Sequence, residues 1–351
     1  MRKGFTLLLG VVLSCITLSA QDQHFTQFYA SPVTLNPALT GAFTGKYRLS
    51  LIYRDQWRSV LENPYVTYSG AADFRFGFNK RKANYKDAAG VGVLFYNDRI
   101  PDIGFSTSQV QISAAFHKSL SKNNDQFLSL GAQFGIAQRN VNYDKLTFED
   151  QFNGTNGYSN NTGEPLPENN FAYGDFNVGL NYTYAPEQQV GVFIGAAMYH
   201  ILEPSVSFFY DNDNPDRYPD DRWQRKYVAH VGLQIPTGNV VQIMPRALYY
   251  RQGPHNAVNA GTNLRFLVDE IRGNALHVGG WVRLNNDETK KWLASAAIGM
   301  VGVELGNFLI GLSYDATLSD LTKTKRGQGA FEISIAYLGE YEDDTVLCPK
   351  F

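Results

Sequence analysis

Cysteine and long apolar runs are both scarce in this sequence. Only two of its 351 residues are cysteines, Cys15 and Cys348. Cys15 lies in an amino-terminal segment that we expect to be removed, so a single thiol remains and no internal disulfide is expected. Beyond residue 20 no run of 18 apolar residues occurs, which excludes a membrane protein built from helices.

Charge is also sparse, at 18% of the residues, and no basic block is present. Without Arg2 and Lys3 the chain carries 29 basic and 33 acidic residues, a net charge of −4. Nucleic acid is therefore not an expected partner. The six histidines show no metal-ligand spacing, and HExxH, GxSxG and CxxC motifs are absent. We expect neither an enzyme nor a bound metal or cofactor.

The first 20 residues have the three parts of a secretory signal peptide. Arg2 and Lys3 form a basic start, residues 5–13 are apolar, and residues 18–20 offer small side chains before a polar pair. We expect cleavage after Ala20, which leaves a mature chain of residues 21–351.

Aromatic residues and glycine are abundant, and many segments alternate in polarity. In residues 47–57, Tyr47, Leu49 and Leu51 share one face, whereas Arg48 and Arg54 lie on the other. Transmembrane strands of about 9–11 residues alternate in this way between lipid and lumen. Fourteen segments fit the pattern: 46–57, 65–76, 89–98, 106–119, 126–142, 172–185, 188–202, 225–236, 239–252, 256–268, 273–284, 292–303, 306–316 and 328–339.

The connections between these segments alternate in length, as in outer-membrane barrels. The two longest, about 143–171 and 203–224, are both odd-numbered, although the connections near 77–88 and at Gly253 fit poorly. The sequence predicts an all-β fold, a transmembrane antiparallel β-barrel of about 14 strands over residues 46–340. Both termini are expected to be periplasmic, with 341–351 as a short tail.

Isolated charged residues occupy the inward positions of the predicted strands. Such charges suit a water-lined lumen better than a dry core, where an unpaired charge is costly. The candidate lumenal polar residues are Arg48, Arg54, Arg139, Asp315 and Glu332.

The second long connection combines aromatic and acidic residues. Its aromatic side chains are predicted to form an exposed, partner-binding surface. Residues 211–221 superficially resemble a calcium loop but lack its glycine and its closing glutamate, so we favour a solvated acidic loop. The candidate partner-binding residues are Phe208, Phe209, Tyr210, Tyr218 and Trp223.

The segment after the expected cleavage site carries three recognisable motifs: QFYASP at 27–32, LNPALTG at 35–41 and YRDQW at 53–57. Together with GVGVLFYN at 90–97 and the carboxy-terminal CPKF, they resemble the PorP/SprF family of the Bacteroidetes type IX secretion system. The resemblance runs through the whole mature chain, and lysine replaces the arginine usual in the family's final residues. Within it, Gln27, Tyr29, Asn36 and Pro37 are the amino-terminal motif residues.

The resemblance implies a non-enzymatic outer-membrane barrel that assists secretion and surface retention of a partner. Such a partner is an adhesin or a gliding-motility protein with a carboxy-terminal secretion domain, alongside other secretion components. The main alternative is an outer-membrane channel for small or hydrophobic solutes. Residues 21–45 precede the first strand, and the sequence leaves two placements open for them: a plug in or below the barrel, or a flexible periplasmic lead-in.

Overall fold

The computed structural model describes residues 25–78, 85–209, 220–269, 272–286, 291–318 and 328–339. The expected signal peptide, residues 1–20, and the expected tail, residues 341–351, lie outside this part of the chain. No helix within the described ranges is long and apolar enough to cross a membrane.

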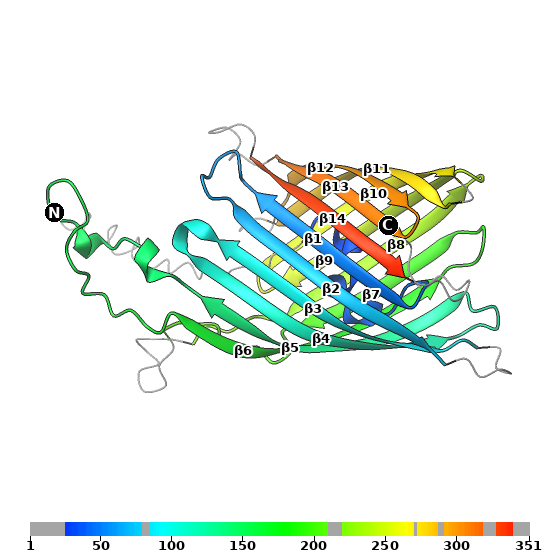
Figure 1. Ribbon diagram of the computed structural model, residues 1–351, viewed down its shortest axis with the longest axis horizontal. Helices are drawn as coiled ribbons and strands as arrows, with labels where there is room; N and C mark the ends of the chain where they lie inside the picture. The colour runs from blue at the N-terminus through cyan, green and yellow to red at the C-terminus, as the bar shows by residue number, and fades with distance from the viewer. Residues whose placement is uncertain are drawn as a thin grey trace, which may run out of the picture.

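The described residues form a closed antiparallel barrel of 14 strands (Figure 1). Each strand pairs with its sequence neighbours, and β1 pairs with β14 to close the barrel. The strand number and order predicted from the alternation are therefore confirmed. The strands are β1 (Tyr47–Gln56), β2 (Tyr65–Gly77), β3 (Ala88–Ile100), β4 (Phe105–Ser119), β5 (Gln126–Asn140), β6 (Asn170–Tyr184), β7 (Gly191–Tyr199), β8 (Lys226–Thr237), β9 (Val241–Gln252), β10 (His255–Asp269), β11 (Asn274–Asn286), β12 (Trp292–Leu305), β13 (Phe308–Thr317) and β14 (Gly329–Gly339).

The alternating residues separate onto the two faces of the barrel wall. On β1, Leu49 and Leu51 are exposed on the outside, whereas Arg48, Ser50 and Arg54 are buried on the inside. Because successive side chains of a strand point to opposite faces, the period of two sets this separation. Apolar residues exposed on the outside suit contact with lipid, which removes the penalty of exposing them to water.

The two ends of the barrel differ in their connections. One end, here called the loop end, carries residues 141–169 between β5 and β6 and residues 200–225 between β7 and β8. Residues 141–169 project well beyond the rim of the barrel (Figure 1). The other end, the turn end, has shorter connections such as 306–307 and 238–240.

The connection at Gly253 belongs to the loop end despite its shortness. It is a two-residue turn of Gly253 and Pro254, since His255 already pairs with Gln252. Gly253 has φ of +55°, a left-handed conformation that favours glycine. The predicted strand count is correct at this point, because β9 and β10 pair with each other right up to this two-residue turn.

Candidate functional site

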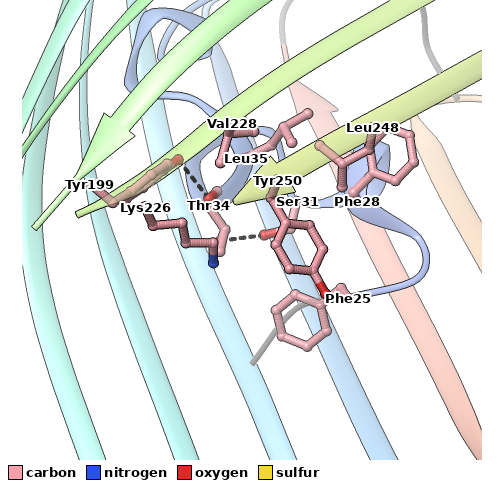
Figure 2. Close-up of a pocket in the computed structure, with 10 residues that line it drawn as sticks. All are labelled: Phe25, Phe28, Ser31, Thr34, Leu35, Tyr199, Lys226, Val228, Leu248 and Tyr250. Atoms are coloured by element: carbon pink, nitrogen blue, oxygen red, sulfur yellow. Dashed lines mark hydrogen bonds between the residues drawn. The ribbon is translucent and has the colours of Figure 1, made fainter. Parts of the chain in front are cut away.

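The lumen is occupied by residues 25–43, which we call the plug. The plug contains three short helical turns, η1 (Phe28–Ala30), α2 (Pro32–Leu35) and η2 (Pro37–Leu39). All of its residues are buried except Tyr29, Thr34 and Leu35, which are half-buried. Figure 2 shows Ser31, Thr34 and Leu35 beside Tyr199 and Val228 of the barrel wall, and the Tyr199 hydroxyl donates to the Thr34 carbonyl at 2.9 Å.

An ionic cluster holds the start of the plug near the loop end. The Glu332 carboxylate accepts hydrogen bonds from the backbone N–H groups of Thr26 at 2.8 Å and Gln27 at 2.9 Å. Arg54 pairs with Glu332 and, at 3.1 Å, with Asp315, and Arg283 pairs with Asp315 at 2.8 Å. Two guanidinium groups thus balance two carboxylates, as burial of charge requires.

The cluster changes the picture of the lumen given by the sequence. Arg54, Asp315 and Glu332 are at most 5% exposed, and the Thr26 hydroxyl donates to Asp315 at 2.7 Å. The expectation of isolated charges in a water-lined lumen is wrong for these three residues. They lie together, and the plug fills the space that water was expected to occupy.

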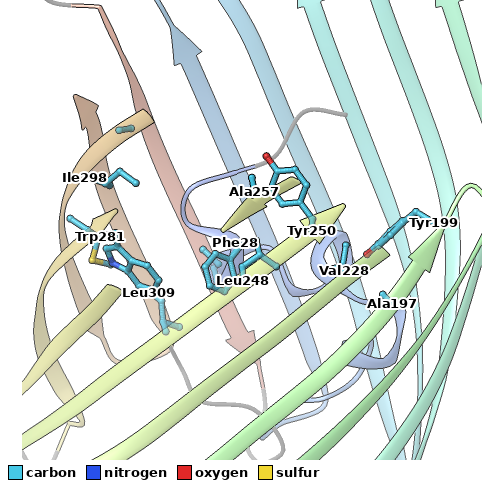
Figure 3. Packing of buried hydrophobic residues seen from close by; sticks show 14 of the residues in the cluster. Phe28, Ala197, Tyr199, Val228, Leu248, Tyr250, Ala257, Trp281, Ile298 and Leu309 are labelled. Carbon is cyan, nitrogen blue, oxygen red and sulfur yellow. The ribbon is translucent and has the colours of Figure 1, made fainter. Parts of the chain in front are cut away.

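Aromatic packing holds the middle of the plug. The Tyr29 ring stacks on Trp281 with ring centres 5.5 Å apart, and the Arg246 guanidinium lies 4.4 Å from the Tyr29 ring centre. Burial raises the pKa of Tyr29 to about 12, so its hydroxyl stays neutral. Phe28 meets Trp281 edge-on at 5.6 Å and joins a buried apolar cluster with Leu248 (Figure 3).

Asn36 and Pro37 fix the next turn of the plug. The Asn36 side chain accepts from the Ala38 N–H at 2.9 Å and donates to the Leu180 carbonyl at 3.1 Å. The barrel wall makes room for this turn with glycine: a Cβ at Gly131 would collide with the Pro37 backbone, and one at Gly179 with the Asn36 side chain. The wall is therefore shaped to the plug at these positions.

Arg48 holds the end of the plug near the turn end. Its guanidinium pairs with Asp73 at 2.7 Å and donates to the Leu39 carbonyl at 3.0 Å. Asp73 in turn accepts from the Gly41 N–H at 2.7 Å. Gly41 has φ of +72° and lies against Gly90, where any Cβ would collide with Thr40.

Trp223 does not lie on an exposed surface. Its indole N–H donates to the Tyr173 hydroxyl at 2.9 Å, its ring stacks on His200 at 5.2 Å, and the Arg139 guanidinium lies 4.8 Å from its ring centre. The exposure expected for Trp223 is wrong, because backbone hydrogen bonds between residues 204–206 and 221–223 hold this part of the connection together. Arg139 also donates to the Val206 carbonyl at 3.0 Å.

The other aromatic candidates of this connection differ among themselves. Phe208 packs edge-on against Phe171, with ring centres 4.9 Å apart, and is half-buried. Phe209 is exposed. Tyr210 and Tyr218, together with most of the acidic stretch 211–221, lie outside the described residues.

Several residues that hold the plug were not identified from the sequence. Thr26, Asp73 and Arg283 carry no motif of their own. Asp73 and Arg283 lie on predicted strands, so alternation places them inward, but the alternation does not reveal their partners. Thr26 precedes all the predicted strands, and no period marks it.

Several solved structures are similar to most of this chain, at low sequence identity. No functionally curated protein matches the chain. Three distant structural likenesses are a Pseudomonas aeruginosa FadL homologue (10% identity, 89% of this chain and 94% of that chain, TM-score 0.48), a deltaS2 mutant of the TodX monoaromatic hydrocarbon channel (10%, 89% and 94%, 0.47) and CdiB from Escherichia coli (10%, 83% and 63%, 0.43).

A family model described as type IX secretion system membrane protein PorP/SprF matches residues 17–337. The match includes the plug, 13 of the strands in full and nearly all of β14. The chain therefore belongs to the PorP/SprF family of type IX secretion system membrane proteins and is an outer-membrane β-barrel.

Proposed function

We propose that this barrel assists type IX secretion and retains a secreted partner protein at the cell surface. The partner is an adhesin or a gliding-motility protein, held through its carboxy-terminal secretion domain while other secretion components contact the barrel. The barrel acts by binding, with no catalytic step. Family membership supports the link to secretion, and the projecting connection at the loop end supports the binding role.

The main support for the proposal is the structure of the projecting connection, residues 141–169. At the tip, Phe152 and Tyr158 form a backbone bridge with ring centres 5.4 Å apart, and the two residues are 46% and 60% exposed. The Asn153 carboxamide oxygen accepts from three backbone N–H groups of the intervening turn, including that of Thr155 at 3.0 Å. A shaped tip with exposed aromatic side chains is typical of a protein-binding surface.

The charge of this connection specifies the partner's surface. Residues 141–169 contain five acidic residues and one lysine. A partner surface that combines basic and apolar groups therefore complements it, and the attraction between unlike charges speeds their encounter.

The same proposal sets the orientation of the barrel. Tyr47 and Gly339, the ends of the first and last strands, pair with each other at the turn end. With the loop end outside the cell, both ends of the barrel chain open toward the periplasm, where other secretion components reach them. Long external loops and short periplasmic turns are the usual arrangement.

The test is co-purification of the membrane-extracted barrel, with mass spectrometry of whatever remains bound. Replacing residues 149–163 with a short Gly-Ser linker should release the partner and leave the barrel heat-modifiable on gels, because the contacts of Asp150 with Thr162 and Gly163 stay within the excised segment. The control replaces the turn of residues 185–190, at the opposite end, and should keep the partner. A partner that survives the first replacement refutes the proposed grip.

A channel for hydrophobic solutes is the second candidate, favoured by one cavity. This cavity lies between the plug and strands β7 to β9 and is lined mostly by apolar side chains, among them Phe28, Leu35, Val228 and Leu248 (Figure 2). Passage through the lumen would require the plug to move. Steady large currents in planar bilayers would favour the channel, and a closed barrel would favour the binding role.

A further inference from the structure

β7 is the shortest of the 14 strands, and it leaves part of β6 without a neighbour at the loop end. β7 has nine residues, whereas β6 has 15. The two strands pair only from Val178, opposite Met198, toward the turn end. On its other side β6 pairs with β5 along its whole length. Residues 170–175, which we call the open edge, therefore have a paired strand on one side only.

The hydrogen bonds at the two sides of β6 show which backbone groups the open edge presents. The Asn169 carbonyl, one residue before β6, accepts from the Val141 N–H at 2.9 Å, so odd-numbered residues bond toward β5. The Phe176 carbonyl accepts from the Ile201 N–H at 3.1 Å on the opposite side. Because the backbone groups of a strand alternate in direction, the N–H and C=O groups of the even-numbered residues point away from β5.

Ala172 and Gly174 are the central residues that present such groups. Their N–H and C=O groups have no hydrogen-bond partner among the described residues, and both residues are exposed. A row of unpaired backbone groups at a strand edge is a template for pairing with another chain. Since the groups repeat at every second residue, the ligand that matches them is an extended polypeptide segment.

The open edge lies beyond the lipid-facing band of the barrel. On the neighbouring strand β5, the exposed apolar residues of the outer face end at Ile136, which pairs with Gly174. Gln138 and Asn140 follow on the same face toward the loop end. Lipid offers no hydrogen bonds to a bare strand edge, so an edge in water beside the membrane is one that a protein segment can reach.

The side chains beside the open edge define the chemistry of the segment. On the outer face, a Cβ added at Gly174 would approach only Phe134 and a carbonyl, at 3.8 Å or more, so there is room for a bulky side chain across from it. On the inner face, Phe171 and Phe208 pack edge-on with ring centres 4.9 Å apart. Apolar side chains on both faces, with an aromatic or β-branched residue over Gly174, therefore suit this position.

We propose that the open edge receives an extended apolar strand of the retained partner protein, which adds to β6 beside the end of β7. The inference rests on the proposed function, because it specifies how that partner is held. The projecting residues 141–169 lead directly into β6, so a partner held at the tip lies next to the open edge (Figure 1).

The test is hydrogen exchange of single amides, followed by NMR on the full-length barrel in lipid nanodiscs with and without its co-purified partner. In the barrel alone, the amides of Ala172 and Gly174 should exchange fast, whereas those of Tyr173 and Asp175 should exchange slowly because they face β5. In the complex, the amides of Ala172 and Gly174 should slow at least about tenfold, as the gain of one backbone hydrogen bond implies.

Two variants at one position separate the edge from its surroundings. Gly174→Pro removes an N–H that points away from β5, so it blocks strand addition and leaves the β5–β6 pairing in place. It should lower the amount of co-purified partner at least about tenfold. Gly174→Ala is the matched control, since it keeps the N–H, and it should retain the partner. Ala172→Pro is a second blocking variant, and heat-modifiability on gels should show that all three barrels are folded.

The outcomes separate this inference from the proposed function. A wild-type barrel that retains no partner overturns both. A retained partner that leaves the amides of Ala172 and Gly174 fast, or that binds equally to both proline variants, overturns the strand addition alone. Slow exchange of these amides in the barrel alone would mean that this chain already covers the edge, or, if it grows with barrel concentration, that a second copy does. Either result would also overturn the assignment to a partner strand.

Discussion

Replacing Glu332 with glutamine should loosen the start of the plug without unfolding the barrel. The Glu332 carboxylate accepts from two plug N–H groups, at 2.8 and 2.9 Å, and pairs with Arg54. A glutamine in the same rotamer would turn one acceptor into a donor that faces a donor, and it would remove the charge. Hydrogen bonds to a charged group are each worth about 1.5–3 kcal/mol, so the loss is about 3–5 kcal/mol.

Backbone hydrogen exchange measures this loss directly. The free energy needed to open a segment determines how strongly its amides are protected from exchange. Each 1.4 kcal/mol of that free energy changes the protection factor tenfold. Protection of the amides in residues 26–31 should therefore fall about 10²- to 4 × 10³-fold in Glu332→Gln. Protection at residues 38–42 should change much less, because the contacts of Arg48 and Asp73 with that end of the plug are intact.

Glu304→Gln is the matched control. Glu304 is as buried as Glu332, but its carboxylate pairs with Arg265 at 2.6 Å and His277 at 2.9 Å, both on the barrel wall rather than the plug. Its replacement should weaken the β10–β12 wall and leave plug protection unchanged. If Glu304→Gln exposes residues 26–31 as strongly as Glu332→Gln, or if neither does, the ionic cluster does not hold the plug.

Two further predictions concern the shaped wall and the projecting tip. Gly179→Ala should displace the Asn36 turn of the plug and lower the melting temperature by several degrees, whereas Gly280→Ala, whose Cβ would meet nothing within 4 Å, should leave it unchanged; heat-modifiability against temperature measures both. The double replacement Phe152→Ser with Tyr158→Ser should reduce co-purified partner at least tenfold while the strands stay folded by circular dichroism; unchanged recovery would exclude these rings from the interface.

The barrel was predictable because its determinants are local and periodic. On β1 the alternation of Leu49 and Leu51 with Arg48 and Ser50 states which side of the wall each residue faces, and a period of two identifies a strand. Tight turns with glycine mark where strands end, as at Gly253 and Gly306. Lipid on one side and a filled lumen on the other enforce the pattern over all 14 strands.

The sequence did not decide where the plug lies, because the contacts that fix its position are not local. Residues 25–43 have no period, and their partners lie far along the chain, as Thr26 and Glu332 do at a separation of 306 residues. The family motif marks Gln27, Tyr29, Asn36 and Pro37, but a motif does not say what its residues touch. Similarly, the aromatic content of residues 208–223 could not separate buried Trp223 from exposed Phe209.

The ionic cluster also crosses the seam at which the barrel closes. Arg54 lies on β1 and Glu332 on β14, opposite each other in the pairing of the first and last strands. Thr26 of the plug contacts Glu332 and Asp315, the latter on β13, so plug docking and seam closure share one set of charges. Contacts between residues so distant in the chain are slow to form, because the loop-closure entropy must be overcome first.

Arg54→Met should therefore destabilise the barrel chiefly by slowing its folding, with a smaller effect on the rate of unfolding. Arg265→Met is the control, since Arg265 makes a comparable buried pair with Glu304, but within the β10–β12 wall and away from the seam. The assay is refolding into lipid vesicles, followed by the appearance of the heat-modifiable form. Arg54→Met should lower the folding rate about tenfold or more, whereas Arg265→Met should mainly raise the unfolding rate. Equal slowing by both variants would mean that the charges stabilise the finished wall and take no part in closing it.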